Sequence, residues 1–172
     1  PPVRLIRNGE MNHELIEILQ CNSRQPGSLY GDLNGQLNAL DLGEKRLHAL
    51  LEDYGPQTVK EAFTELKQRA EQLMRANIKE LPDGTISCDD YLDNDGIVDE
   101  SLRIGLDLKV SGDEMTLDFS RTSKACAGPV NISRSTAIAS CYVALKHLFQ
   151  EVPANSGVLE PIRFVIPDGC LP

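Results

Sequence analysis

Two runs of apolar residues at helical spacing, divided by Gly55-Pro56, constrain the fold of this 172-residue chain more than any other feature. The first run consists of Leu33, Leu37, Leu40, Leu47, Leu51 and Tyr54. The second run consists of Val59, Phe63, Leu66, Ala70, Leu73 and Met74. This spacing predicts two long amphipathic helices. Gly commonly ends a helix and Pro commonly begins one, so we expect an antiparallel helical hairpin that stops at residues 81–84.

A shorter helix and a polar turn precede the hairpin. Residues 11–21 have a helical apolar side, with Asn12 as the candidate N-cap. Residues 22–30 contain the Pro and Gly of a turn. Asp32 lies one residue before the first apolar run, where a helix cap or a first-turn carboxylate is expected.

The periodicity changes to two after residue 84. Residues 85–88 predict a short strand, and residues 102–110 alternate apolar and polar side chains in the clearest strand pattern of the chain. The alternation resumes at 115–119 after a turn at 111–114. These segments predict a β-hairpin that is buried on one face.

A further helix and strand complete the expected fold. Asn131 or Ser133 caps a helix that runs to about residue 149, and residues 158–166 form a strand interrupted by a proline. The fold class is therefore α+β, with a long helical hairpin, a small antiparallel sheet and a further helix; an α/β arrangement stays open. We expect a single domain over 1–172, with a helical part at about 11–81 and a mixed part at about 82–172.

Composition excludes several kinds of partner. Hydrophobic residues make up 41% of the chain, which is enough for a core, but the formal net charge is −9, aromatics are 5% and Trp is absent. Binding to nucleic acid or to an anionic membrane needs clustered cations, so we expect neither. No apolar run approaches the ~20 residues of a membrane helix. Five cysteines without a CxxC pair indicate reduced thiols in the cytoplasm.

Polar residues near the turn at 22–30 are candidates for a binding site. A turn requires Pro and Gly but does not require Arg24, Asp32 and Gln36 as well. Asp32 and Gln36 are one helical turn apart, so they can face one site. The alternative is structural: Arg24 and Asp32 form an ion pair that caps the long helix.

A second group of candidates follows the second strand of the β-hairpin. Asp118 stands at the end of that strand, next to the loop that contains Thr122 and leads to Asn131. Strand ends that open into loops are common places for chemistry, but Asp118 is equally well explained as a solvent-facing residue.

The acidic cluster Asp89, Asp90, Asp93, Asp95 and Asp99 does not match a calcium loop, because the first and last ligand positions fall on Tyr91 and Leu102. We interpret it as a solvated turn between two strands. His13, His48 and His147 are far apart and match no metal signature, so we expect no metal ligands in this chain.

Several short motifs, taken together and in order, resemble the hydantoinase B family. They cover nearly the whole chain: Asn22-x-Arg24-x-Pro26, Gly31-Asp32-Leu33-x-x-Gln36, Gly43-x-x-Arg46, Leu81-Pro82-Asp83-Gly84, 90–96, 117–122, 128–131, Asn155-Ser156-Gly157 and 166–169. The family departs from this chain at two positions, with Gly at 121 and Ala at 35. Arg121 would place a charge beside Asp118, with which it could pair.

The resemblance implies one part of a two-part enzyme and an internal segment of a longer B subunit. A partner A-type ATPase subunit binds ATP and Mg and phosphorylates a carbonyl of a small cyclic amide, and the B part opens the ring. The implied complex is a hetero- or homo-oligomer. The segment itself binds no cofactor, and a divalent metal would lie upstream of residue 1.

The implied roles are specific. Asp32 and Asp118 are catalytic, with Asp118 as general base, while Arg24, Gln36, Asn131 and Thr122 bind substrate. Two alternatives remain open at this stage. One is a non-catalytic scaffold that docks the A subunit, and the other is a segment of a ketone carboxylase.

Overall fold

A computed structural model describes residues 3–169, and Cys170 lies outside this range. The described chain divides into two compact units, residues 3–59 and 60–169, which are treated separately below. The boundary between the units falls inside the second long helix rather than near residue 81. The expectation of a single domain stays a prediction.

The 3–59 unit contains two short strands and two helices: β1 (Ile6–Arg7), β2 (Glu10–Met11), α1 (His13–Cys21) and α2 (Pro26–Tyr54). Asn12 caps α1 as expected, because its Oδ1 accepts the Leu15 N–H at 3.1 Å. Pro26 is the first residue of α2. Asp32 therefore lies inside the helix, past the first turn, and the prediction of a cap or first-turn carboxylate is wrong.

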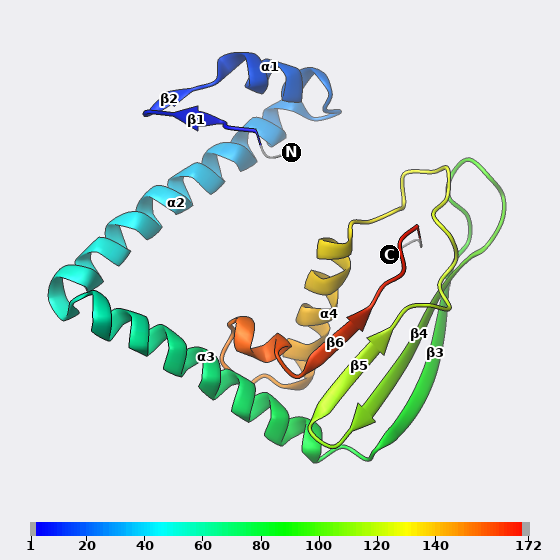
Figure 1. Ribbon diagram of the computed structural model, residues 1–172. Coiled ribbons are helices and arrows are strands. Elements are labelled where there is room, and N and C mark those ends of the chain that lie inside the picture. Colours follow the sequence, from blue (N-terminus) through cyan, green and yellow to red (C-terminus); the bar gives the residue numbers. More distant parts are fainter. Residues whose placement is uncertain (1–2, 170–172) are drawn as a thin grey trace. The chain divides into compact units, whose positions relative to one another are not determined.

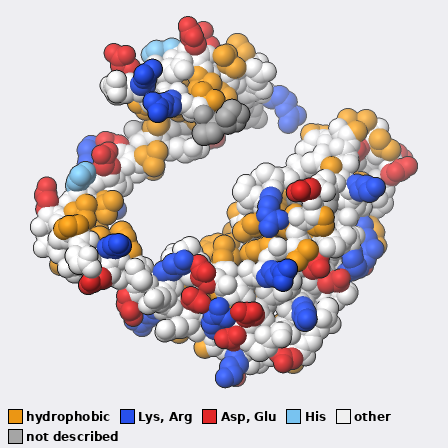
Figure 2. All heavy atoms as spheres, viewed as in Figure 1, with side chains coloured by type: hydrophobic (Ala, Val, Ile, Leu, Met, Phe, Trp, Pro, Cys, Tyr) orange, Lys and Arg blue, Asp and Glu red, His pale blue; other side chains and the backbone are white. Residues whose placement is uncertain are grey.

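The predicted apolar stripe of α2 is present, but none of its residues is buried. Leu40 is 71% exposed and Tyr54 is 62% exposed. Figure 2 shows hydrophobic side chains at the surface near the end of α2, at the left of the view. Gly55, at φ 79°, ends α2, and α3 (Pro56–Lys79) follows at once. Both long helices are confirmed, and their packing as a hairpin stays a prediction.

The 60–169 unit is built on a four-stranded sheet (Figure 1). Its strands, in spatial order, are β3 (Gly84–Leu92), β4 (Leu102–Ser111), β5 (Glu114–Asp118) and β6 (Ile162–Val165). The first three are antiparallel, but β6 runs parallel to β5, so the sheet is mixed rather than antiparallel.

Three predicted boundaries in this unit are corrected. β3 continues well past residue 88 because it pairs with residues 102–110 of β4. The last strand begins only at Ile162, since a 3₁₀ turn, η1 (Ser156–Leu159), precedes it. Ser133, not Asn131, caps α4 (Arg134–Leu148), because its Oγ accepts the Thr136 N–H.

The core of the 60–169 unit lies between the sheet and three helical segments. Its buried residues come from α3, from β4 to β6, from α4 and from the segment that follows α4: Ala70, Met74, Ile78, Val110, Met115, Leu117, Phe119, Leu145, Phe149, Val152, Val158 and Ile162. The C-terminal half of α3 thus packs with the sheet. The α+β class is confirmed.

Candidate functional site

A cavity of about 370 Å³ lies between one end of the sheet and α4. Its lining is apolar except for Ser140 and Cys141: Leu92, Ile104, Phe119, Val130, Ile132, Ala137, Ser140, Cys141 and Ala144. The Ser140 hydroxyl donates to the Thr136 carbonyl at 3.0 Å. Burial raises the pKa of the Cys141 thiol, so it stays protonated near neutral pH. The cavity suits the hydrocarbon part of a small molecule better than a charged group.

Three of the sequence motifs meet around this cavity. Leu92 comes from the 90–96 motif, Phe119 from the 117–122 motif and Val130 from the 128–131 motif. The first of these motifs ends about 20 residues before the second, and the second and third lie close together in the loop after β5, so the folded sheet and its loops bring all three to one place. The cavity is therefore a candidate binding pocket to which three of the motifs contribute.

Asp95 joins two of these motifs. Asp95 is only 4% exposed. Its carboxylate accepts hydrogen bonds from the backbone N–H groups of Ile97 at 2.8 Å, Val98 at 2.6 Å and Gly128 at 2.9 Å. The bonds from Val98 and Ile97 contribute most to lowering the pKa of Asp95. The expectation of a solvated acidic turn is thus wrong for Asp95, which is a buried structural carboxylate.

Gly128 is required by this contact. A Cβ at Gly128 would lie 1.9 Å from the carbonyl oxygen of Asp95, well inside van der Waals distance. A side chain at position 128 would therefore force the two loops apart.

Thr122 and Asn131 also make structural contacts in this region. The buried Thr122 hydroxyl accepts the Gly105 N–H at 3.1 Å and donates to the Gly105 carbonyl at 3.0 Å. The Asn131 side chain accepts the Cys126 N–H at 2.9 Å and donates to the Cys126 and Gly128 carbonyls. Both side chains hold the loop that follows β5, and their predicted role in binding substrate stays a prediction.

Asp118 ends β5, as expected, and accepts the Ser120 N–H at 2.8 Å. Hydrogen bonds from the Ser120 side chain and backbone lower the pKa of Asp118, with a smaller contribution from the charge of Arg163. Asp118 is therefore ionised at neutral pH, as a general base must be, but it is a weaker base than an ordinary carboxylate.

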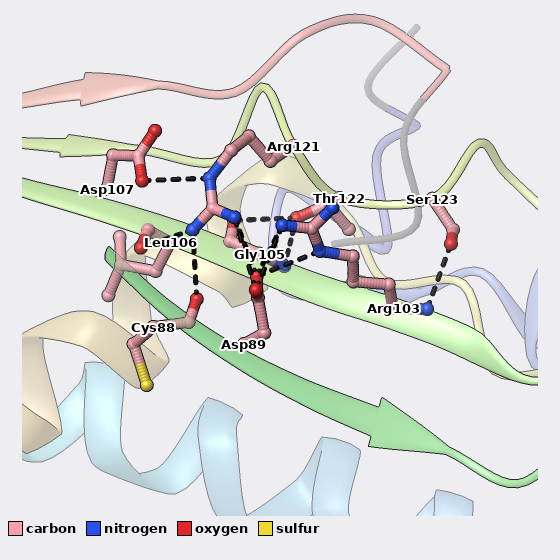
Figure 3. A network of polar contacts seen from close by, with 9 residues as sticks. All are labelled: Cys88, Asp89, Arg103, Gly105, Leu106, Asp107, Arg121, Thr122 and Ser123. Carbon is pink, nitrogen blue, oxygen red and sulfur yellow. Dashed lines mark hydrogen bonds and ion pairs between the residues drawn. The ribbon is translucent and has the colours of Figure 1, made fainter.

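Arg121 contacts other carboxylates instead of Asp118. Its Nε donates to Asp107 at 2.8 Å, and its Nη1 lies 2.9 Å from Asp89 (Figure 3). Its Nη2 donates to the Cys88 carbonyl at 3.3 Å and the Leu106 carbonyl at 3.2 Å. The guanidinium thus joins β3 and β4.

Arg103 completes this network on Asp89. Its Nε and Nη2 donate to the two carboxylate oxygens at 2.8 and 2.9 Å, a bidentate pair. Partial burial would raise the pKa of Asp89, but the hydrogen bonds from Arg103 and Arg121 outweigh it, and the pKa is lowered. Gly105 makes room for this arrangement, since a Cβ there would lie 2.8 Å from the Cβ of Arg121.

The candidates in the 3–59 unit have different surroundings. Arg24, Asp32 and Gln36 are all exposed, and within residues 3–169 none has a hydrogen-bond or ion-pair partner from another side chain. The predicted ion pair between Arg24 and Asp32 is wrong for the described chain. These side chains remain available for a ligand.

Sequence reasoning did not find the roles of Asp95, Arg103 and Asp107. The available signal for Asp95 was the turn sequence Asn94-Asp95-Gly96, with Gly96 at φ 80°. Arg103 and Asp107 could be placed only after the register of β3 against β4 was known.

Within residues 3–169, no group of three or more His, Cys, Asp and Glu side chains is arranged to hold a metal ion. The same residues include no helix with the length and apolar character needed to span a bilayer.

The fold and the ordered motifs define a B-type subunit segment, and the chain belongs to the hydantoinase B/oxoprolinase family, whose model matches residues 1–172. It is similar to the structure of the ATP-dependent caprolactamase from Pseudomonas jessenii, with 31% identity and a TM-score of 0.82 over 99% of this chain and 30% of that one. It is also 28% identical over 168 residues to the acetophenone carboxylase delta subunit of Aromatoleum aromaticum, covering 95% of this chain and 24% of the relative.

A third relative is the 5-oxoprolinase of Dictyostelium discoideum, which is 23% identical over 177 residues, or 98% of this chain and 14% of the relative. The chain therefore spans less than a third of the length of each of these relatives. The relatives in this family that are named as subunits belong to enzymes of more than one subunit.

Proposed function

We propose that this chain is part of the B subunit of a cytoplasmic, ATP-dependent hydrolase that opens a hydantoin or lactam ring, of the N-methylhydantoinase or 5-oxoprolinase type. The observation that carries the proposal is the likeness to the ATP-dependent caprolactamase, at 31% identity over 99% of the chain. The family match over the whole sequence supports the same class of reaction.

In the proposed reaction a partner A-type ATPase subunit binds ATP and Mg and phosphorylates the amide carbonyl oxygen. An amide carbonyl is a poor electrophile, and phosphorylation of its oxygen activates the carbon for attack by water. Attack forms a new C–O bond, the C–N bond of the ring breaks with transfer of a proton to the nitrogen, and the phosphoryl group leaves as inorganic phosphate. The B part excludes stray water and completes the ring opening. A divalent metal, where the complete protein uses one, binds upstream of this chain.

The proposal assigns roles to side chains in each unit, taken separately. Arg24 clamps a carboxylate or phosphate with its planar fork, Asp32 orients a water, and Gln36 donates to the substrate amide. Asp118 is the proposed base. Thr122 and Asn131 border the substrate through the loop that they hold. The apolar cavity beside that loop takes the hydrocarbon part of the ring.

The test uses the full-length protein with its A-type partner. We expect ATP-dependent ring opening of one member of a panel of hydantoin, 5-oxoproline and caprolactam. Arg24→Ala and Asp32→Asn should each lower kcat/KM by more than about threefold, which is a loss of more than about 0.65 kcal/mol of transition-state stabilisation. Arg7→Ala and Asp53→Asn change exposed residues of the same unit and serve as matched controls.

The same variants separate catalysis from a scaffold role. If Arg24 and Asp32 only help to dock the A subunit, complex formation weakens and the activity per assembled complex stays unchanged. Full activity of both variants would show that these two residues are not part of the site.

The cavity is tested separately with Ala144→Leu, which adds volume at its wall. We expect a higher KM for a ring substrate and little change in the thermal midpoint, because Ala144 is exposed. An unchanged KM would remove the cavity from the proposed site.

A ketone carboxylase is the second candidate, favoured by the 28% identity to the acetophenone carboxylase delta subunit. ATP-dependent incorporation of labelled bicarbonate into acetone or acetophenone, without hydrolysis of any cyclic amide, would identify this branch.

A further inference from the structure

Three neighbouring strands place two cations and a hydroxyl in one row. Lys109 of β4 is paired in register with Thr116 of β5, and Thr116 is paired with Arg163 of β6. Side chains at paired positions lie on the same face of a sheet. Because strands are spaced by about 4.8 Å, the two cations start roughly 10 Å apart on either side of Thr116, within reach of one ligand.

The row borders a hollow of about 390 Å³ on this face. Within residues 3–169, no carboxylate lies within ion-pair distance of Lys109 or Arg163, and the Thr116 hydroxyl has no hydrogen-bond partner. Ser111 is in the next row of the same face and also borders the hollow. Four side chains with donor groups therefore border the hollow, and within residues 3–169 none of the four is paired with an acceptor from another side chain.

The two carboxylates that border the hollow already have partners on α3. Glu160 pairs with Lys67 at 2.5 Å, and Glu114 lies 3.4 Å from Arg75. They therefore compete only weakly for the cations of the row. In the adjacent row of this face, Asp107 of β4 is paired with Asp118 of β5. Asp107 accepts a hydrogen bond from Arg121, and Asp118 senses the charge of Arg163 but is hydrogen-bonded to Ser120. Like charges in one row normally weaken a sheet, and an anion between them would remove that cost.

We propose that the row of Lys109, Thr116 and Arg163 binds a phosphate group. The Arg fork and the Lys ammonium match the charge and the several oxygens of phosphate, and the Thr and Ser hydroxyls donate to the remaining oxygens. The hollow has room for more than a free phosphate ion, so a phosphate monoester also fits. The proposed phosphate site contains none of the residues that are proposed to act in amide hydrolysis. The one link between the two is the charge of Arg163, which contributes to lowering the pKa of Asp118.

The experiment is calorimetric titration of the full-length protein with inorganic phosphate at low ionic strength and constant chloride. We expect saturable binding in the millimolar range. Lys109→Gln and Arg163→Gln should each weaken it by at least about tenfold, and Thr116→Val should weaken it less. Lys124→Gln removes the same charge from an exposed position outside the row and should leave the affinity unchanged. Thermal midpoints of all variants check that they are folded.

Three outcomes would overturn the proposal: no saturable binding, the same loss in Lys124→Gln as in Lys109→Gln, or equal affinity for acetate. A parallel titration with phenyl phosphate identifies the source of the phosphate. Tighter binding of the ester supports a phosphate monoester as the ligand, and tighter binding of the free ion supports inorganic phosphate. Neither result depends on ATP-dependent turnover.

Discussion

At the level of single residues, Asp95 has the most defined structural role in the described chain. One carboxylate accepts three backbone N–H groups and connects the loop after β3 to the loop at Gly128. Charge-assisted bonds of this kind are stronger than neutral ones. Val130 and Ile132, which come shortly after Gly128 in the chain, line the apolar cavity.

Asp95→Asn should therefore lower the thermal midpoint by about 5 °C at neutral pH, since a bond to an ionised acceptor is replaced by a weaker one. The folded-state pKa of Asp95 lies below its unfolded value. Its contribution is present above pH ~4 and is lost as the pH falls through the folded pKa. Thermal unfolding at a series of pH values should show the difference between wild type and variant shrinking in acid. A difference that grows as the pH falls would contradict this account.

Two glycines make a matched pair for a second residue-level prediction. A Cβ at Gly128 would meet the Asp95 carbonyl at 1.9 Å, whereas Gly35 in α2 has open space around it. Gly128→Ala should cost about 1–3 kcal/mol, and Gly35→Ala should stabilise α2 by up to about 1 kcal/mol. Denaturant unfolding followed by circular dichroism measures both. Equal changes in the free energy of unfolding for the two substitutions would show that neither the contact at Gly128 nor the helix propensity at Gly35 determines the effect.

At the level of elements, the charged residues of β3 and β4 explain why β3 is longer than its sequence indicates. Asp89 is a poor strand residue by itself, but in β3 it lies opposite Gly105 and accepts bonds from Arg103 and Arg121. The strand pairing thus converts part of an apparent acidic turn into a ladder. The hydrogen bonds that make Asp89 acceptable in a strand come from Arg103 and Arg121, which are 14 and 32 positions after it in the sequence.

The network predicts a coupling between Asp89 and Arg121. Asp89→Asn and Arg121→Gln should each lower the thermal midpoint by a few degrees, and the double variant should lose less than the sum. Raising the salt concentration should reduce the effect of each single variant, because the side chains are partly exposed. Additive losses would mean that the ion pair contributes nothing and that each side chain acts alone.

Short-range sequence patterns predicted the helices, which form from residues that are close together in the sequence. The helices α1, α2, α3 and α4 follow from 3.6-residue periodicity and from caps such as Asn12 and Ser133. The parallel pairing of β6 with β5 could not be predicted in the same way, since the two strands are joined by a long connection through α4. For the same reason the cavity was not predicted, although three of the motifs around it were recognised.

At the level of the whole molecule, burial is distributed unevenly between the two units. The buried cluster belongs entirely to the 60–169 unit, and α2, with 29 residues, buries none. Helices gain most of their stability in proteins from packing of an apolar face. Within the 3–59 unit α2 therefore has little tertiary support, even though its apolar stripe is well formed.

Hydrogen exchange should reveal this difference. In the 172-residue chain we expect the slowest amides in β4, β5 and the half of α3 that contains Met74 and Ile78, which are fully buried. Amides of α2 should exchange by local opening, at least about tenfold faster than those of β4.

The same measurement on the full-length protein, with and without its A-type partner, shows what covers α2 there. Protection of α2 that appears only with the partner would identify the stripe as a docking surface, whereas protection that appears in the full-length protein alone would identify it as an internal contact. Protection of α2 equal to that of β4 in the 172-residue chain would contradict the prediction, because it would require support for α2 that the described residues do not supply.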